Sequence, residues 1–355
     1  MRTAARLELR RRALRFIALG PLLMYSAAAR PARQIPPLEQ LKAGYRRRLA
    51  GLLAKKALPY IDIESSCNSD ELNIDALARN MDELDIGAMA LSADISGSAY
   101  ERGVRYDPLA VRLVEKFPDR FIPAGNGGVP PIWRRDPQAL LGDYEREVGE
   151  GNLLLMGEFE FRHYPSPRQV RRGADRDESV PIDGEIGHRL FKLSEGSGLA
   201  FQIHYEIEDG LLPPLEKMLT AYPKAKVIWC HLAQVRYIER AGRYSPAYVE
   251  GLIKRFPNLH FDTAFGGPNS VYPLSGQRHA RVWADDGALK AEWLELLVAH
   301  PERFLAALDL GGDRMHLIRD WDAGLRQFLN RLPAGARNQI AYRSAWKLLF
   351  GEEFD

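Results

Sequence analysis

Residues 227–231 of this chain read Val-Ile-Trp-Cys-His, an apolar run that ends on a histidine. Residues 201–204 (Phe-Gln-Ile-His) and 304–309 (Phe-Leu-Ala-Ala-Leu-Asp) repeat the pattern and end on His204 and Asp309. Short apolar runs of this kind are typical of buried parallel strands. A parallel barrel brings the carboxyl ends of its strands to one mouth. We therefore expect His204, His231 and Asp309 to converge there, and these residue types bind divalent metals.

A fourth apolar run, residues 60–64 (Tyr-Ile-Asp-Ile-Glu), opens the globular part of the chain. Its two carboxylates, Asp62 and Glu64, are two residues apart and therefore point to the same face of a strand. We expect Glu64 to join the side chains that meet at the mouth.

Strand alternation also predicts which neighbours share a face. Gln202 should lie on the same face as His204, and Trp229 on the same face as His231. Ile228 should occupy the opposite face and pack against helices, because parallel strands are covered on both sides.

Strand and helix patterns alternate about eight times over residues 60–332. This alternation predicts an α/β fold with a parallel sheet, and eight units close a barrel. The prediction is a (β/α)8 TIM barrel over residues 58–355, with a C-terminal closing helix and a preceding linker and helix over residues 30–57. A doubly wound open sheet is the alternative, but residues 64–68 (Glu-Ser-Ser-Cys-Asn) are not the glycine-rich loop that usually follows its first strand.

Four of the predicted helices end in an aromatic residue or a histidine followed by proline. The pairs are Phe117-Pro118, Tyr222-Pro223, Phe256-Pro257 and His300-Pro301. Proline disfavours the helical conformation in the residue before it. We expect each helix to end at that point and the chain to turn toward the next strand.

The first 29 residues contain the three parts of an export signal in order. Six arginines precede an apolar stretch over residues 16–29, which ends in Ser26-Ala27-Ala28-Ala29. The stretch is short for a bilayer span and suits a cleaved signal peptide, and the arginines at 10–12 also resemble a twin-arginine signal. The hypothesis is export, to the bacterial periplasm, with no stable membrane span afterwards. An uncleaved membrane anchor is the alternative.

Removal of residues 1–29 would take away six arginines and Glu8, a net charge of +5, and change the charge of the chain from +2 to −3. A chain without basic excess gives no indication of a nucleic-acid partner. We expect a small-molecule substrate, and a homodimer is compatible with the sequence.

These motifs resemble the amidohydrolase superfamily, especially the amidohydrolase-related branch that includes metal-dependent decarboxylases of aromatic acids. In that family the first strand ends in Asp-x-His-x-His, the fifth and sixth strands end in His, and the eighth in Asp. His204, His231 and Asp309 match the last three positions, and residues 344–350 (Ser-Ala-Trp-Lys-Leu-Leu-Phe) resemble the closing helix, with Ser344 in place of an Asn. The resemblance covers roughly residues 58–351 and implies a TIM barrel with a divalent metal at its mouth.

The first strand departs from the family pattern, because Glu64 and Ser66 stand where histidines are expected. Glu64 can replace an imidazole as a metal ligand, whereas Ser66 is a poor ligand. Exchanging nitrogen for oxygen favours manganese, magnesium or calcium relative to zinc. We expect one divalent metal, zinc or manganese, and the alternative is a site that binds none.

The resemblance also implies roles for individual residues. The metal ligands would come from Glu64, His204, His231, Asp309 and Glu158, the last of which ends the fourth strand. Asp309 would accept a proton from the attacking water, and His231 would polarise or protonate the substrate.

Other residues near the predicted mouth are candidates for supporting roles. Arg134, beside Trp133 after the third strand, could bind a substrate carboxylate. His163 could replace a missing histidine, and Asp262 is expected to support the site without binding the metal. Asp313 could cap a helix.

Two functions are therefore open. The first is a metal-dependent hydrolase of the amidohydrolase type that cleaves a C–N or C–O bond of a small molecule, with decarboxylation as a variant. The second is a metal-free, catalytically degenerate barrel that acts as an exported binding protein. The retained His204, His231 and Asp309 favour the first, and the missing histidines of the first strand favour the second.

Overall fold

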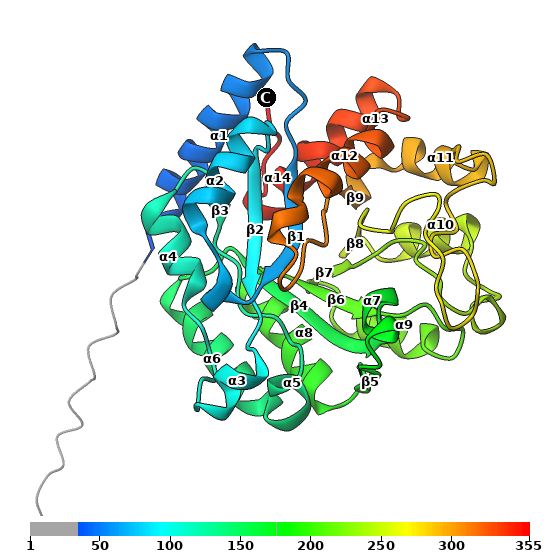
Figure 1. The fold of residues 1–355 in the computed structure, drawn as a ribbon, viewed down its shortest axis with the longest axis horizontal. Coiled ribbons are helices and arrows are strands. Elements are labelled where there is room, and N and C mark those ends of the chain that lie inside the picture. Colours follow the sequence, from blue (N-terminus) through cyan, green and yellow to red (C-terminus); the bar gives the residue numbers. More distant parts are fainter. Residues whose placement is uncertain (1–34, 175) are drawn as a thin grey trace, which may run out of the picture. The chain divides into compact units, whose positions relative to one another are not determined.

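The computed structural model describes residues 35–174 and 176–355, so the predicted signal segment, residues 1–29, lies outside the described residues. The strands form two sheets, ordered β1-β2-β3 and β5-β4-β6-β7-β8-β9 (Figure 1). Their bounds are β1 Ile61–Cys67, β2 Ala88–Ala93, β3 Phe121–Ile122, β4 Leu155–His163, β5 Glu178–Ser179, β6 Ala200–Tyr205, β7 Lys226–Trp229, β8 Leu259–Asp262 and β9 Phe304–Leu305.

Neighbouring strands are parallel, with the exception of the short antiparallel pair β4 and β5. Parallel bridges link the two sheets at both sides: Ala124 pairs with Leu155 next to β3 and β4, and Ser65 pairs with Leu310 next to β1 and β9. The backbone N–H of Asp309 also donates to the carbonyl of Glu64 at 3.0 Å. The predicted parallel α/β fold is confirmed, and the loop that follows β9 lies against β1.

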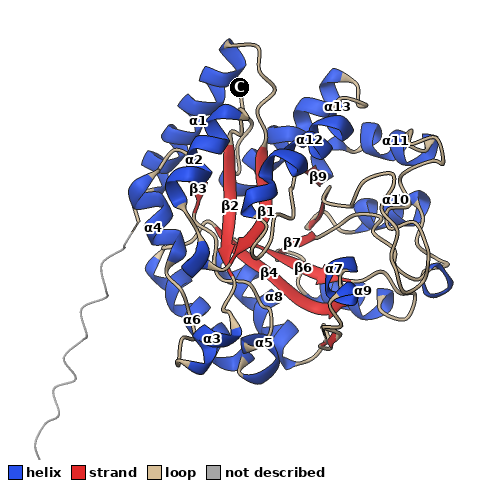
Figure 2. Cartoon of the chain, viewed as in Figure 1, coloured by secondary structure: helices blue, strands red, loops and turns tan. Residues whose placement is uncertain are grey.

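Helices lie around the outside of the strands (Figure 2). Their bounds are α1 Leu38–Ala54, α2 Ile74–Glu83, α3 Gly97–Glu101, α4 Leu109–Lys116, α5 Ile132–Arg135, α6 Pro137–Glu150, α7 Pro167–Arg171, α8 Glu185–Ser197, α9 Leu212–Ala221, α10 Pro246–Arg255, α11 Ala291–Ala299, α12 Ile318–Leu329, α13 Ala334–Asn338 and α14 Ser344–Phe350. The helix expected before the first strand is therefore present as α1, and the expected closing helix as α14.

The proline pattern predicts four helix ends correctly. Helices α4, α9, α10 and α11 each end one residue before the aromatic residue or histidine that precedes proline. That residue has left the helical region in every case, with φ between −139° and −122° at Phe117, Tyr222, Phe256 and His300. Local sterics before proline therefore set where these helices stop.

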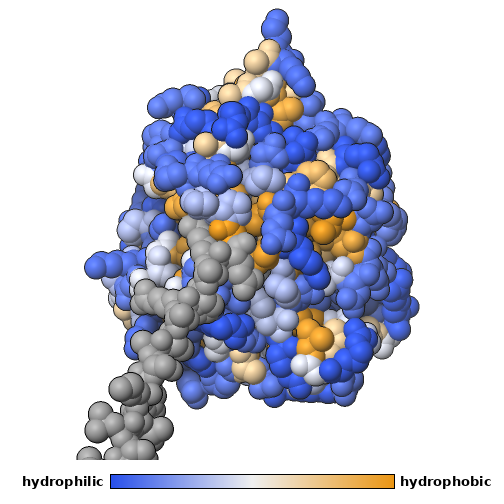
Figure 3. All heavy atoms as spheres, turned by 90° about the vertical axis from the view of Figure 1, so that its left-hand side faces the viewer, coloured by the Kyte–Doolittle hydropathy of each residue, from blue (hydrophilic) through white to orange (hydrophobic). Residues whose placement is uncertain are grey.

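The core lies between the strands and the surrounding helices. Strands β2 and β6 are buried at every residue, as expected when helices cover a parallel sheet. The coloured part of the face seen in Figure 3 is mostly hydrophilic, with small apolar patches between polar side chains. Among the described helices, none combines the length and the apolar character that a membrane crossing requires.

Candidate metal centre

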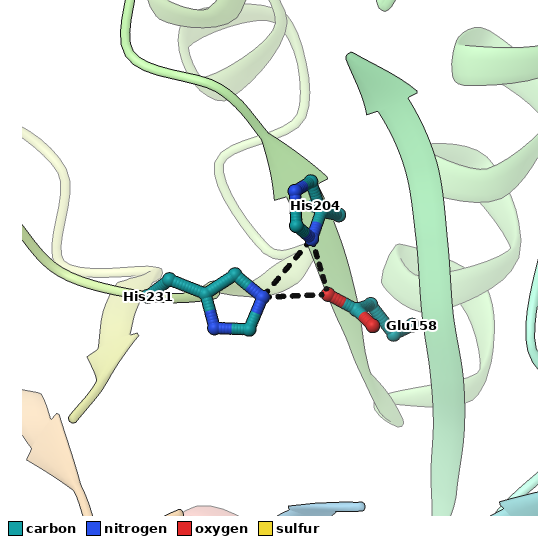
Figure 4. A group of neighbouring side chains, drawn as sticks. All are labelled: Glu158, His204 and His231. Carbon is teal, nitrogen blue, oxygen red and sulfur yellow. Dashed lines mark hydrogen bonds and ion pairs between the residues drawn. The ribbon is translucent and has the colours of Figure 1, made fainter. Parts of the chain in front are cut away.

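Three side chains from neighbouring strands meet near the carboxyl ends of β6 and β7, beside the middle of β4 (Figure 4). His204 comes from β6, and His231 follows β7. Glu158 lies in the middle of β4, which continues to His163, so the prediction that Glu158 ends the fourth strand is wrong. Glu158 Oε1 lies 3.1 Å from His204 Nδ1 and 3.2 Å from His231 Nε2, and the two ring nitrogens are 3.0 Å apart. The predicted convergence of His204 and His231 is therefore found, with Glu158 as the third member.

Both imidazoles are held by acceptors outside this cluster. His231 Nδ1 lies 3.0 Å from the carbonyl oxygen of Ala264, and His204 Nε2 lies 3.1 Å from Glu206 Oε1. Since those atoms only accept, we assign the N–H of each neutral ring to them. The remaining lone pairs, on His231 Nε2 and His204 Nδ1, then point toward each other and toward the Glu158 carboxylate. Three acceptors in contact repel one another unless a cation lies among them.

The spacing of the three atoms suits a metal ion. With metal–ligand distances of about 2.1 Å, two ligand atoms lie about 3.0 Å apart at a 90° angle and about 3.4 Å apart at a tetrahedral angle. A small cavity lined by His204, Glu206, His231 and Gln234 lies beside the two imidazoles and has room for about one water molecule. The residues present therefore fit a bound divalent metal.

Electrostatics place negative charge in this cluster. Burial disfavours the charged form of Glu158, but in the absence of a metal His204 and His231 can carry protons toward this carboxylate, and these protons hold its pKa well below the usual value. Burial also opposes protonation of His204, yet its contacts with Glu158 and Glu206 raise its pKa to about 10. A cation, whether a proton or a metal ion, is strongly favoured between these groups.

The route by which His231 enters the cluster differs from the prediction. Gln202 pairs in register with Ile228, and Ile203 pairs with Trp229. Neighbours in register share a face of a parallel sheet, so Ile228 lies on the face of Gln202, and Trp229 lies on the other.

The prediction that Trp229 shares a face with His231 is therefore wrong. Trp229 packs among the aromatic rings of Tyr205, Tyr244 and Phe261. His231 reaches the cluster because its backbone, just past β7, has φ +63°. That conformation is costly for a residue with a side chain and is typically retained at functional sites.

A second group of ligand atoms adjoins the first. Glu64, His231 and Asp262 each offer an atom within 4.8 Å of the others. The inward position of Glu64 agrees with its predicted place at the mouth. The register of β1 with β2 shifts between Asp62 and Ser65, and such bulges commonly redirect side chains next to sites.

Asp62, by contrast, has a structural role. Its carboxylate accepts hydrogen bonds from the Leu308 N–H at 2.9 Å and from the Ser65 hydroxyl at 2.7 Å. It therefore ties β1 to the segment after β9.

Asp309 was expected among the metal ligands and Asp262 outside them, and the structure places them the other way round. Asp309 belongs to neither group of ligand atoms, and its carboxylate lies 3.4 Å from Arg314 Nη2. Its charge nevertheless acts on Glu64 and His231. Asp262, expected to stand outside the ligand set, lies within it.

The predicted substrate contact of Trp133 is wrong. Trp133 is 1% exposed, its indole N–H donates to the carbonyl of Glu160, and its ring packs against Phe159 and Phe161. It is a core residue with no face open to a ligand. Arg134, in the same short helix α5, forms an ion pair with Glu178 of β5, so its predicted role toward a substrate stays a prediction.

Neither of two further predicted residues joins the cluster. The ring of His163 lies 4.5 Å from that of His204, and its Nδ1 lies 3.0 Å from the carbonyl of Arg176. Burial lowers its pKa well below the usual value, so it is neutral. Asp313 forms an ion pair with Arg168 of α7 and caps none of the described helices.

Glu206 and Arg236 are functional candidates that sequence reasoning missed. Both are buried, and Arg236 Nε lies 2.9 Å from Glu206 Oε1, the oxygen that also contacts His204. Arg236 also donates to the carbonyls of Tyr164 and Pro165, each at 2.9 Å. The signal available in the sequence was Glu206 itself, two residues after a candidate ligand.

No family model matches the chain, and no curated protein matches it. Among solved structures, the chain is similar to a candidate amidohydrolase from Staphylococcus aureus, at 13% identity, 82% coverage of this chain, 99% coverage of that chain and a TM-score of 0.48. It is also similar to 2,6-dihydroxybenzoate decarboxylase from Rhizobium, at 14% identity, 82% coverage of this chain, 98% coverage of that chain and a TM-score of 0.46. A third similar structure is amidohydrolase 2 from Bifidobacterium longum subsp. infantis, at 13% identity, 82% coverage of this chain, 99% coverage of that chain and a TM-score of 0.44. At such identities and TM-scores, function has to be judged from the residues of the site.

Proposed function

We propose that this chain is a metal-dependent enzyme of the amidohydrolase-related type, acting on a small molecule. One observation carries the proposal: a carboxylate oxygen of Glu158 and one ring nitrogen each of His204 and His231 lie within 3.2 Å of one another, while the other nitrogen of each ring contacts an acceptor outside the cluster. Such outer partners are typical of metal-ligating histidines. The family motifs at His204, His231 and Asp309 agree with this assignment.

The strand arrangement supports the barrel form of the fold. The eight parallel strands β1, β2, β3, β4, β6, β7, β8 and β9 follow in chain order, and bridges at Ser65–Leu310 and Ala124–Leu155 link the two sheets. We infer that they close into a (β/α)8 barrel, in which the cluster occupies the carboxyl-end mouth, the usual place of active sites in this fold.

Glu158, His204 and His231 would hold the metal, which when bound supplies Lewis-acid polarisation of the substrate and an acidified water. Glu206 keeps the Nε2 proton of His204 outside the cluster, so that Nδ1 stays available. Asp309 is the candidate proton acceptor, because its carboxylate is partly exposed and its charge reaches His231. This assignment favours hydrolysis of a C–N or C–O bond, with decarboxylation as the variant reaction.

The cavity beside the cluster is too small for a substrate. It has room for about one water molecule, which is far below the several hundred Å³ of a typical small-molecule pocket. A substrate that approaches through this cavity therefore requires the surrounding side chains to shift.

The test is metal content and thermal stability of the purified chain and of His204→Ala, with and without chelator. We expect about one zinc per chain in the wild type, its loss in His204→Ala, and a lower melting temperature after chelation, because a ligand that binds only the folded state stabilises it. If the wild type binds less than about 0.1 equivalent of every metal offered and chelation leaves its melting unchanged, the metal-free binding barrel replaces this proposal.

A further inference from the structure

The group formed by Glu64, His231 and Asp262 differs in chemistry from the group formed by Glu158, His204 and His231. It contains two carboxylates and one imidazole, whereas the other contains one carboxylate and two imidazoles. Glu64 is 3% exposed and Asp262 is 0% exposed. Both carboxylates are therefore removed from the water that would otherwise solvate them.

One oxygen of each carboxylate is buried and has no hydrogen-bond partner among the described residues: Glu64 Oε2 and Asp262 Oδ2. The other oxygen of Asp262 accepts from the backbone N–H of His231 at 2.7 Å and of Ala264 at 3.0 Å. The nearby Cys230 thiol interacts with Asp262 but is only a weak donor. Leaving buried carboxylate oxygens without partners is expensive, so these two atoms point to a ligand.

Charge identifies the ligand as a cation. Glu64 experiences the negative charges of Asp262, Glu158 and Asp309. No arginine or lysine among the described residues forms an ion pair with either carboxylate. Buried carboxylates in such surroundings have to be protonated or bound to a cation.

His231 belongs to both groups and limits how many ions they can bind together. Its Nδ1 is engaged by the carbonyl of Ala264, so only Nε2 offers a lone pair. One nitrogen lone pair cannot ligate two ions. The two groups therefore compete for His231.

We propose that Glu64, Asp262 and His231 form a second, oxygen-rich cation position, which alternates with the position at Glu158 and His204 so that one ion is bound at a time. Two carboxylates select a hard ion such as manganese or magnesium, whereas two imidazoles suit zinc. The chain then binds different metals at different positions. This inference rests on the proposed metal centre, because both positions use His231.

The experiment titrates the full chain with Zn²⁺ or Mn²⁺ by equilibrium dialysis, with electron paramagnetic resonance as a second readout for manganese. Wild type is compared with His204→Ala, Asp262→Asn and Glu64→Gln. We expect Asp262→Asn and Glu64→Gln to weaken manganese binding at least about tenfold and to change zinc binding by less than about threefold. His204→Ala should show the reverse pattern, because it deletes a nitrogen ligand of the first group, whereas the two amide substitutions remove the negative charge that a hard cation requires.

The outcomes separate this inference from the proposed function. One outcome is that the wild type binds zinc, that His204→Ala loses it, and that Asp262→Asn and Glu64→Gln leave manganese binding unchanged. This outcome overturns the second position and leaves the proposed metal centre intact. Manganese binding that depends on Asp262 and Glu64, without zinc binding, supports the second position and overturns the first. Two ions per chain overturn the competition, and no binding of either metal overturns both proposals.

Folding of the variants is checked by circular dichroism and melting. Asp262→Asn keeps an amide oxygen that accepts the two backbone hydrogen bonds at His231 and Ala264. If this variant nevertheless fails to fold, Glu64→Gln decides, because Glu64 Oε2 has no hydrogen bond to lose.

Discussion

The carboxylate of Glu206 lies 3.1 Å from Nε2 of His204, while Nδ1 of the same ring lies 3.0 Å from Nε2 of His231. One imidazole thus has a buried anion on one edge and the candidate metal position on the other. Arg236, 2.9 Å from the same Glu206 oxygen, keeps that anion charged and in place, and Glu206 has its pKa held low by this neighbourhood despite burial. The basicity and the orientation of His204 therefore depend on two residues that do not touch the metal position.

The first prediction concerns Glu206→Gln. The amide retains the shape and can still accept from His204 Nε2, but it loses the charge that strengthens His204 as a ligand. We expect zinc affinity to fall about 10–100-fold, the range for outer partners of metal-ligating histidines. The metal-free protein should also melt at a lower temperature, because Arg236 loses its buried partner, so affinity is measured at a temperature where the variant is folded. Competition with a fluorescent chelator measures the affinity. Zinc affinity equal to wild type would show that Glu206 has only a packing role.

The second prediction concerns Asp309→Asn. Because Asp309 lies outside both groups of ligand atoms, the variant should bind zinc within about threefold of wild type. Turnover of an amide or ester substrate found by screening should fall by about 10²-fold or more, since an amide cannot accept the proton. Metal analysis and steady-state kinetics on the same preparation check both parts. Loss of zinc from this variant would instead make Asp309 a ligand, as the family resemblance implies.

The third prediction concerns pH and Asp94, which follows β2 and accepts a hydrogen bond from Ser66 at 2.7 Å. Burial raises the pKa of Asp94 to about 7, although the Ser66 hydroxyl and the Arg176 charge act to lower it. In the unfolded chain the pKa is about 3.9. Between these two values the folded state holds a proton that the unfolded state releases.

The free energy of unfolding therefore falls as pH rises from about 4 to about 7, by at most about 4 kcal/mol from this group. Asp94→Asn should flatten that dependence, so that the variant gains stability relative to wild type as pH rises. Urea unfolding of the metal-free proteins at several values of pH measures this dependence of the unfolding free energy on pH. Parallel curves for the two proteins would rule out a titrating Asp94.

The fourth prediction concerns export. Because residues 1–29 carry a basic region, an apolar region and a small-residue end in order, we propose that they are cleaved as a signal peptide. Expression of the whole chain in a bacterium with a periplasm should yield a mature N-terminus near Arg30 in the periplasmic fraction. N-terminal sequencing that returns intact early residues would refute cleavage.

Local sequence determined several features without help from the rest of the chain. Proline placed the ends of α4, α9, α10 and α11, because the steric restriction acts on the adjacent residue. Apolar runs ending on His204 and His231 indicated strands whose carboxyl ends meet, because parallel strands align their ends. These are properties of short segments, and they were predicted correctly.

Tertiary structure alone decided which side chains form the site. His231 turns inward through a positive φ, and its backbone N–H is held by Asp262, 31 residues later in the chain. Strand alternation cannot anticipate such a turn, because distant residues impose it after the strand has ended. The same reason explains why Asp262 took the place expected of Asp309, and why Trp133 is in the core and not at the mouth. Periodicity fixes the faces of a strand, whereas contacts between segments fix the positions just beyond its end.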